Sequence, residues 1–116
     1  MKDLEKLPII DSKLATKLAD NKQNLANEML ELLIKELPKD VKEINELFSQ
    51  KKYDELRQRL HKLHGALCYC GTPRLKEIVS LCEAQLKKNK INELNKLIDH
   101  LNKEVDLLLQ NLSPIP

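Results

Sequence analysis

The stretch LHKLHGALCYCGTPRLKEIV, residues 60–79, decides the fold of this 116-residue chain. Apolar residues recur in it at intervals of three and four, both before and after Gly71, a spacing typical of helices with one buried face. Gly71 suits the position just past a helix end, and Thr72-Pro73 offers an N-cap followed by proline at the first helical position. The stretch therefore predicts a tight hairpin of two helices.

Outward from this hairpin, the same spacing predicts five helices. The first is short and follows Pro8, with Asp11 or Ser12 as its N-cap. The other four are expected at residues 24–49, 53–70, 73–88 and 90–112. Four long amphipathic helices with short connections favour an all-α fold, an antiparallel up-down-up-down four-helix bundle with a short extra N-terminal helix. One domain of residues 1–116 is expected.

Pro38 lies inside the apolar pattern of the second helix. Proline removes a backbone donor and clashes with the preceding turn. The apolar residues Leu37, Val41, Ile44 and Phe48 nevertheless keep their spacing across it. One long helix, kinked at Pro38, is therefore predicted in place of two.

Composition agrees with a helical fold and excludes several other classes. Only 3% of residues are aromatic and there are two glycines, whereas sandwiches, barrels and dinucleotide-binding domains need turn glycines and β-branched runs. The net charge is +2, and positive and negative residues are interleaved along the chain. This distribution argues against a nucleic-acid partner. No apolar run approaches the ~20 residues that cross a bilayer, so no membrane contact is expected.

Cofactor and redox chemistry are not indicated either. A Gly-rich phosphate loop is absent from the sequence, so the chain is not expected to bind ATP, and no cofactor is predicted. The three cysteines, Cys68, Cys70 and Cys82, are odd in number and lack C-x-x-C spacing. A disulfide framework or a zinc ribbon is therefore not expected, and a cytoplasmic location is favoured.

The segment His61-Lys62-Leu63-His64-Gly65 holds the most informative chemistry. At about 100° per residue, the leucines of the third helix face the core. An adjacent stripe holds Arg57, His61, His64, Gly65 and Cys68. A glycine inside a helix costs ~1 kcal/mol relative to alanine, and here it opens the space beside His61. Neutral imidazole is a nucleophile, and nearby cationic groups can stabilise an anionic product. The pattern predicts a histidine that carries a phosphoryl group.

At these residues the chain resembles the histidine-containing phosphotransfer (HPt) domains of bacterial multistep phosphorelays. Their mark is His-x-x-Lys-Gly followed by a glycine that closes the helix, here His61 to Gly65 and then Gly71. The similarity extends to the short first helix, the proline-kinked second and Leu81-Cys82-Glu83 on the fourth. It is nearest to the C-terminal HPt domain of BarA-type hybrid sensor kinases, which also have histidine in place of the usual lysine. Two departures are Ala66, where serine is common, and Lys52, where aspartate often caps the third helix.

The resemblance implies a role for each site residue. His61 is the phosphoacceptor, Gly65 leaves room for the partner, and His64 replaces the lysine that contacts the phosphoryl group. Receiver docking is assigned to Arg57, Lys62 and Cys68. The implied partners are the receiver domains of a hybrid sensor kinase and of a response regulator, which supply the Mg²⁺ and the aspartate.

The same resemblance implies an activity, an oligomeric state and a location for the chain. A phosphotransfer intermediate without its own ATP site, and not an enzyme, is expected. It would act as a monomer in the cytoplasm, free or as the cytosolic C-terminal domain of an inner-membrane sensor kinase.

Three other interpretations of the motif stay open at this point. A zinc ion could be held by His61, His64 and Cys68, although a fourth ligand is missing from the sequence. His61 could be an ordinary surface histidine. The chain could also be a helical adaptor or oligomerisation module, but such a module has no need for Gly65.

Overall fold

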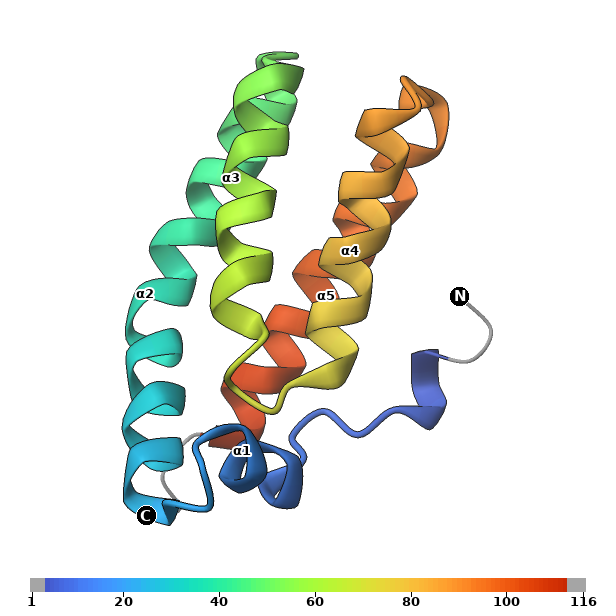
Figure 1. The fold of residues 1–116 in the computed structure, drawn as a ribbon. Helices are drawn as coiled ribbons and strands as arrows, with labels where there is room; N and C mark the ends of the chain where they lie inside the picture. Colours follow the sequence, from blue (N-terminus) through green and yellow to red (C-terminus); the bar gives the residue numbers. More distant parts are fainter. Residues whose placement is uncertain (1–3, 113–116) are drawn as a thin grey trace.

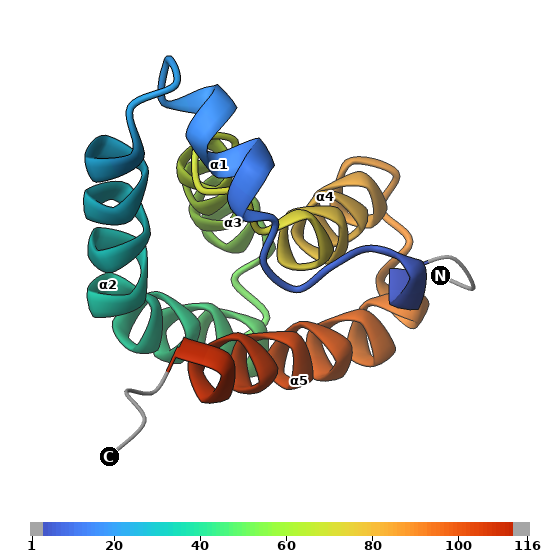
Figure 2. The same ribbon diagram turned by 90° about the horizontal axis from the view of Figure 1, so that it is seen from below.

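A computed structural model describes residues 4–112, apart from the side chain of Leu112. Its elements in chain order are η1 (Leu4–Lys6), α1 (Ser12–Leu18), α2 (Gln23–Ser49), α3 (Tyr53–Leu67), α4 (Pro73–Lys87), η2 (Ile91–Glu93) and α5 (Leu94–Leu112). The four long helices form the bundle and α1 lies at one end of it (Figures 1 and 2). The described residues contain no strand. The predicted all-α bundle with a short extra N-terminal helix is confirmed.

The second helix is continuous through its proline, as predicted. α2 runs for 27 residues with Pro38 inside it, and Figure 2 shows the helix changing direction along its length. Leu37 and Ile44 are both fully buried on either side of the proline. The buried face therefore continues across the bend, and burial of that face offsets the missing backbone hydrogen bond.

The turn between α3 and α4 differs from its prediction in where α3 ends. α3 ends at Leu67, three residues before the expected Cys70, although Cys70 is still buried. Thr72 occupies the N-cap position, but its side chain makes no capping hydrogen bond. Its Oγ1 is buried and has no hydrogen-bond partner among the described residues. The predicted N-cap position of Thr72 and the proline in the first turn are therefore confirmed, although the threonine hydroxyl does not make the capping hydrogen bond.

Gly71 confirms the other half of the hairpin prediction. Its φ is +66°, in the left-handed region that glycine adopts without steric cost. Its carbonyl accepts a hydrogen bond of 2.8 Å from the backbone N–H of Asp11. Asp11 in turn caps α1, because its side chain accepts from the Leu14 N–H at 3.0 Å. The turn thus fastens the N-terminal segment to the bundle.

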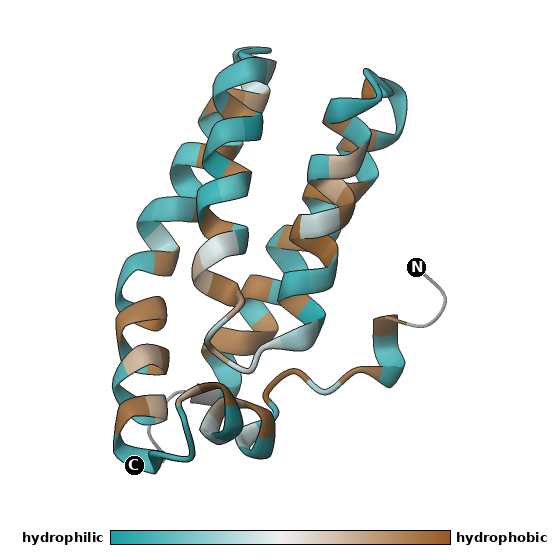
Figure 3. Cartoon of the chain, in the orientation of Figure 1, coloured by the Kyte–Doolittle hydropathy of each residue, from teal (hydrophilic) through white to brown (hydrophobic). Residues whose placement is uncertain are grey.

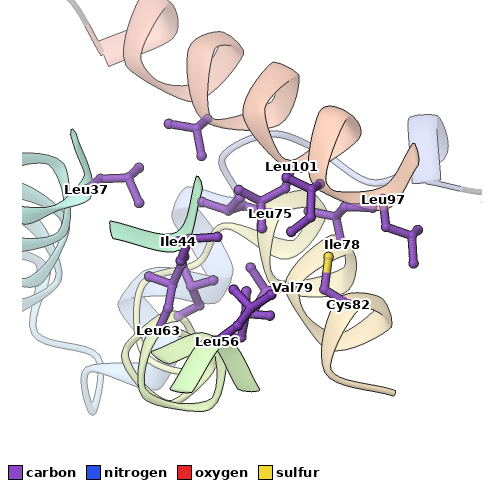
Figure 4. Packing of buried hydrophobic residues seen from close by; sticks show 14 of the residues in the cluster. Leu37, Ile44, Leu56, Leu63, Leu75, Ile78, Val79, Cys82, Leu97 and Leu101 are labelled. Carbon is purple, nitrogen blue, oxygen red and sulfur yellow. The ribbon is translucent and has the colours of Figure 1, made fainter. Parts of the chain in front are cut away.

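A leucine-rich core fills the space between the helices (Figure 4). Hydrophobic bands recur along each long helix with hydrophilic residues between them (Figure 3). The largest fully buried side chains are those of Leu37, Ile44, Leu56, Leu60, Leu63, Leu67, Leu75, Ile78, Leu94, Ile98, Leu101 and Leu108. Burial also raises the pKa of the Cys82 thiol to about 12, so this cysteine stays protonated at neutral pH. The buried cysteines are packing residues.

Charged side chains also link the helices, which the sequence pattern does not reveal. Arg59 of α3 pairs with Asp40 of α2 and donates to Glu43 at 2.8 Å. Arg74 of α4 donates to the buried carboxylate of Glu104 on α5 at 2.7 Å. These pairs hold α3 on α2 and α4 on α5. Across residues 4–112, none of the helices is both long enough and apolar enough to span a membrane.

Candidate functional site

His61 lies on the outer surface of α3. The buried leucines at positions 60, 63 and 67 fix which face of the helix meets the core, and the His61 side chain is consequently 74% exposed. Gly65, one turn later, is also exposed. A Cβ atom built on Gly65 would meet no atom within 4 Å outside its own helix backbone. The predicted open space beside the imidazole is therefore present.

Glu83 is the site residue that has no role in the sequence-based prediction. It lies on α4, its side chain is only 8% exposed, and its Oε2 is 3.1 Å from Nδ1 of His61. A buried carboxylate is costly unless it is paired, so this contact accounts for its position. The sequence does contain one signal for Glu83, its position in the apolar spacing of α4. Glu83 follows the buried Val79 by four residues, where the α4 pattern calls for an apolar side chain.

His64 completes a cluster of three side chains. Its Nδ1 is 3.9 Å from Oε1 of Glu83, which is too long for a hydrogen bond but within ion-pair range. Its side chain is 28% exposed, far less than that of His61. One carboxylate thus faces two histidines, with one oxygen toward each.

The contact with Glu83 favours one tautomer of the His61 ring. A carboxylate only accepts hydrogen bonds, so the contact with Glu83 places the ring proton on Nδ1. Nε2 then keeps its lone pair, and it belongs to a side chain that lies mostly in solvent. Such a nitrogen is a nucleophile whose ring orientation and tautomer are set by a buried partner.

The three residues predicted for docking line three different hollows. Arg57 lines a hollow near the N-terminal end of α3, together with Asp54 and Asn89. Lys62 lines a groove of about 610 Å³ between α2 and α3. Cys68 is half-buried and lines a small cavity beside α1. They lie around α3 on three different parts of its surface, and their docking role stays a prediction.

A metal centre has no support in the part of the chain that the structure describes. Within residues 4–112, no group of three or more His, Cys, Asp or Glu side chains is placed to hold a metal ion. The zinc alternative required His61, His64 and Cys68 to converge, and the shared partner of the two histidines is Glu83 instead.

Comparisons with known proteins identify the family of the chain. The family model for the Hpt domain matches residues 28–112. The chain is 32% identical over 106 residues to the sensor protein GacS of Pseudomonas syringae pv. syringae, covering 86% of this chain. It is 33% identical over 107 residues to the signal transduction histidine-protein kinase BarA of Escherichia coli K12, covering 91% of this chain. In each case the match spans 12% of the relative's length.

A solved structure gives the same result for the fold. The HPT domain from the Hpt sensor hybrid histidine kinase of Shewanella aligns with a TM-score of 0.65 and 32% identity, covering 91% of this chain and 97% of that one. The helical architecture and the matches therefore agree. The chain belongs to the Hpt domain family, and its function is histidine phosphotransfer in phosphorelay signalling.

Proposed function

We propose that His61 accepts a phosphoryl group from the aspartyl phosphate of one receiver domain and passes it to the aspartate of another. Nε2 of His61 attacks phosphorus with its lone pair, and the N–P bond forms as the P–O bond to the aspartate breaks. The aspartate leaves as a carboxylate. The ring becomes cationic while Nδ1 keeps its proton, so charge is conserved in the step.

The contact between Glu83 and His61 carries this proposal. The carboxylate 3.1 Å from Nδ1 holds the tautomer that leaves Nε2 free, and it stabilises the positive charge that the ring gains on phosphorylation. A histidine exposed by chance has no need for a buried carboxylate behind it. Glu83 acts here as a positioning residue, because it touches the imidazole and not the phosphoryl group.

The partner completes the chemistry in this proposal. HPt domains of hybrid kinases work with receiver domains, and the receiver would supply the Mg²⁺ and the aspartate that exchanges the phosphoryl group. His64 would contact the phosphoryl group, and Arg57, Lys62 and Cys68 would contact the receiver. The chain would use no ATP site of its own and would act as a monomer in the cytoplasm.

Transfer from a phosphorylated receiver tests the proposal. A hybrid-kinase receiver domain, phosphorylated with a small phosphodonor, is mixed with this chain and the label on the chain is followed. Phosphate that is labile in acid and stable in base identifies phosphohistidine. Absence of label, or label that is stable in acid, contradicts the proposal.

Replacement of Glu83 should show whether this residue positions the His61 imidazole. Glu83→Gln keeps the shape but loses the charge, and we expect phosphoryl transfer to slow about tenfold, since charged hydrogen bonds are roughly twice as strong as neutral ones. Glu83→Leu should slow transfer further. In the leucine variant, ¹⁵N NMR should show His61 no longer held with its proton on Nδ1.

Glu46→Gln is the matched control, because Glu46 is an exposed residue of α2 and the change in charge is the same. It should transfer at the wild-type rate. Unchanged transfer and an unchanged His61 tautomer in Glu83→Leu would show that Glu83 does not position the imidazole.

A larger side chain at Gly65 should block the partner and not the chemistry. Gly65→Gln should stabilise the helix by up to ~1 kcal/mol, since no atom stands in the way. Transfer from a receiver should nevertheless slow at least about tenfold, because a misplaced partner loses its reactive geometry. Phosphoramidate is small and should still label His61. A less stable variant with normal transfer would mean that Gly65 serves helix packing.

A further inference from the structure

Glu83 places the two histidines in different electrostatic situations. His61 Nδ1 is within hydrogen-bond distance of one oxygen, at 3.1 Å, so a neutral ring can hold this contact as a hydrogen bond, and a protonated ring as an ion pair. His64 Nδ1 lies 3.9 Å from the other oxygen, where attraction depends on charge and therefore on a protonated ring. His64 is also the residue one turn after His61 on the same helix.

The other charged groups near α3 have their own partners or lie elsewhere. On the side of α2, Asp40 and Glu43 are engaged by Arg59. On α4, Lys76 and Glu77 line the cavity beside Cys68, one turn beyond His64. Glu83 is the anion that the structure places against His64. The cations on the same helix are Lys62, Arg57 and the already paired Arg59.

Phosphorylation changes the charge around His64. A phosphoryl group on His61 brings negative charge to within one helical turn, a separation at which side chains interact. Negative charge nearby favours the protonated form of an imidazole. The two events are thermodynamically linked. If phosphorylation of His61 favours protonation of His64, then protonation of His64 favours phosphorylation of His61 to the same extent.

We propose that His64 couples phosphoryl transfer to pH, an inference that rests on the proposed function of His61. As His61 gains the phosphoryl group, the His64 ring binds at most one proton from the solvent. The resulting imidazolium then stabilises the negative charge of the phosphohistidine. Histidine side chains exchange their charge between about pH 5 and 8. The equilibrium between phosphorylated receiver and phosphorylated His61 therefore shifts toward the receiver as pH rises through this range.

The wild-type chain and two variants test the coupling. Wild type, His64→Lys and His64→Gln are each equilibrated with the same phosphorylated receiver at about pH 6 and about pH 8, and the ratio of phosphorylated chain to phosphorylated receiver is measured. Lysine keeps its charge across the range and glutamine has none, so both report the pH response of every other group. We expect the wild-type ratio to fall about fivefold more than either variant's.

The outcomes are distinguishable. A wild-type response equal to that of both variants overturns the coupling while leaving phosphotransfer by His61 in place. No label on the wild type at either pH overturns the proposed function and the coupling with it. A larger wild-type response that disappears equally in both variants supports the coupling.

Discussion

His61→Gln should lose phosphoryl uptake altogether, with label from a phosphorylated receiver falling at least about 100-fold. Glutamine has no nucleophilic nitrogen, but its amide N–H can still donate to Glu83 and avoid leaving that buried carboxylate unpaired. The His61 side chain is 74% exposed, so the melting temperature should stay close to that of wild type. Gel-based transfer assays and thermal unfolding by circular dichroism measure the two effects.

His100→Gln is the matched control for this variant. His100 lies on α5, on the other side of the bundle from the α3 surface, and packs near Glu104. It should take up label as wild type does. Full labelling of His61→Gln would contradict the assignment of the phosphoacceptor, and loss of label in His100→Gln would show that the assay reports something other than His61.

Gly71→Ala should be the most destabilising small change in the chain. A Cβ atom on Gly71 would lie 2.6 Å from Cβ of Ala15 and 2.7 Å from the backbone oxygen of Asp11. Alanine also disfavours the φ of +66° found there. Since backbone must move to relieve these contacts, we expect a loss of about 2–4 kcal/mol in the free energy of unfolding. Urea denaturation measures it.

The second glycine supplies the comparison. Gly65→Ala meets open space and should raise the free energy of unfolding by up to ~1 kcal/mol. The two alanine variants should therefore change stability in opposite directions. Equal stability of Gly71→Ala and wild type would mean that the turn does not fasten α1 and the N-terminal segment to the bundle.

The fold could be predicted from the sequence because its signals are local and repetitive. The leucine spacing fixes the buried face of each helix, and Gly71-Thr72-Pro73 marks the hairpin. The continuous helix through Pro38 was also predictable, since the apolar residues stay in phase across it. The end of α3 was placed three residues too late, because the buried Cys70 continues the apolar spacing after helical geometry has stopped.

The site was predicted only as far as one helix could show it. His61, His64 and Gly65 share a face of α3, and helical periodicity is enough to group them. Glu83 comes from α4, and its approach to His61 depends on how two helices pack, which spacing along one helix does not encode. The same limit applies to the pair of Arg74 with Glu104. Helix angle groups only Arg57 and Cys68 with His61, and the docking role of these two and of Lys62 comes from the resemblance. The three residues line different hollows of the surface.

The central claim is that Glu83 holds His61 so that Nε2 receives the phosphoryl group. NMR of ¹⁵N-histidine-labelled protein, before and after phosphorylation by phosphoramidate, tests it most directly. We predict that His61 carries its proton on Nδ1 in the free protein, and that phosphorus then couples to Nε2 of His61 while Nδ1 stays protonated against Glu83. Coupling to Nδ1 of His61, or to either nitrogen of His64, would contradict the account.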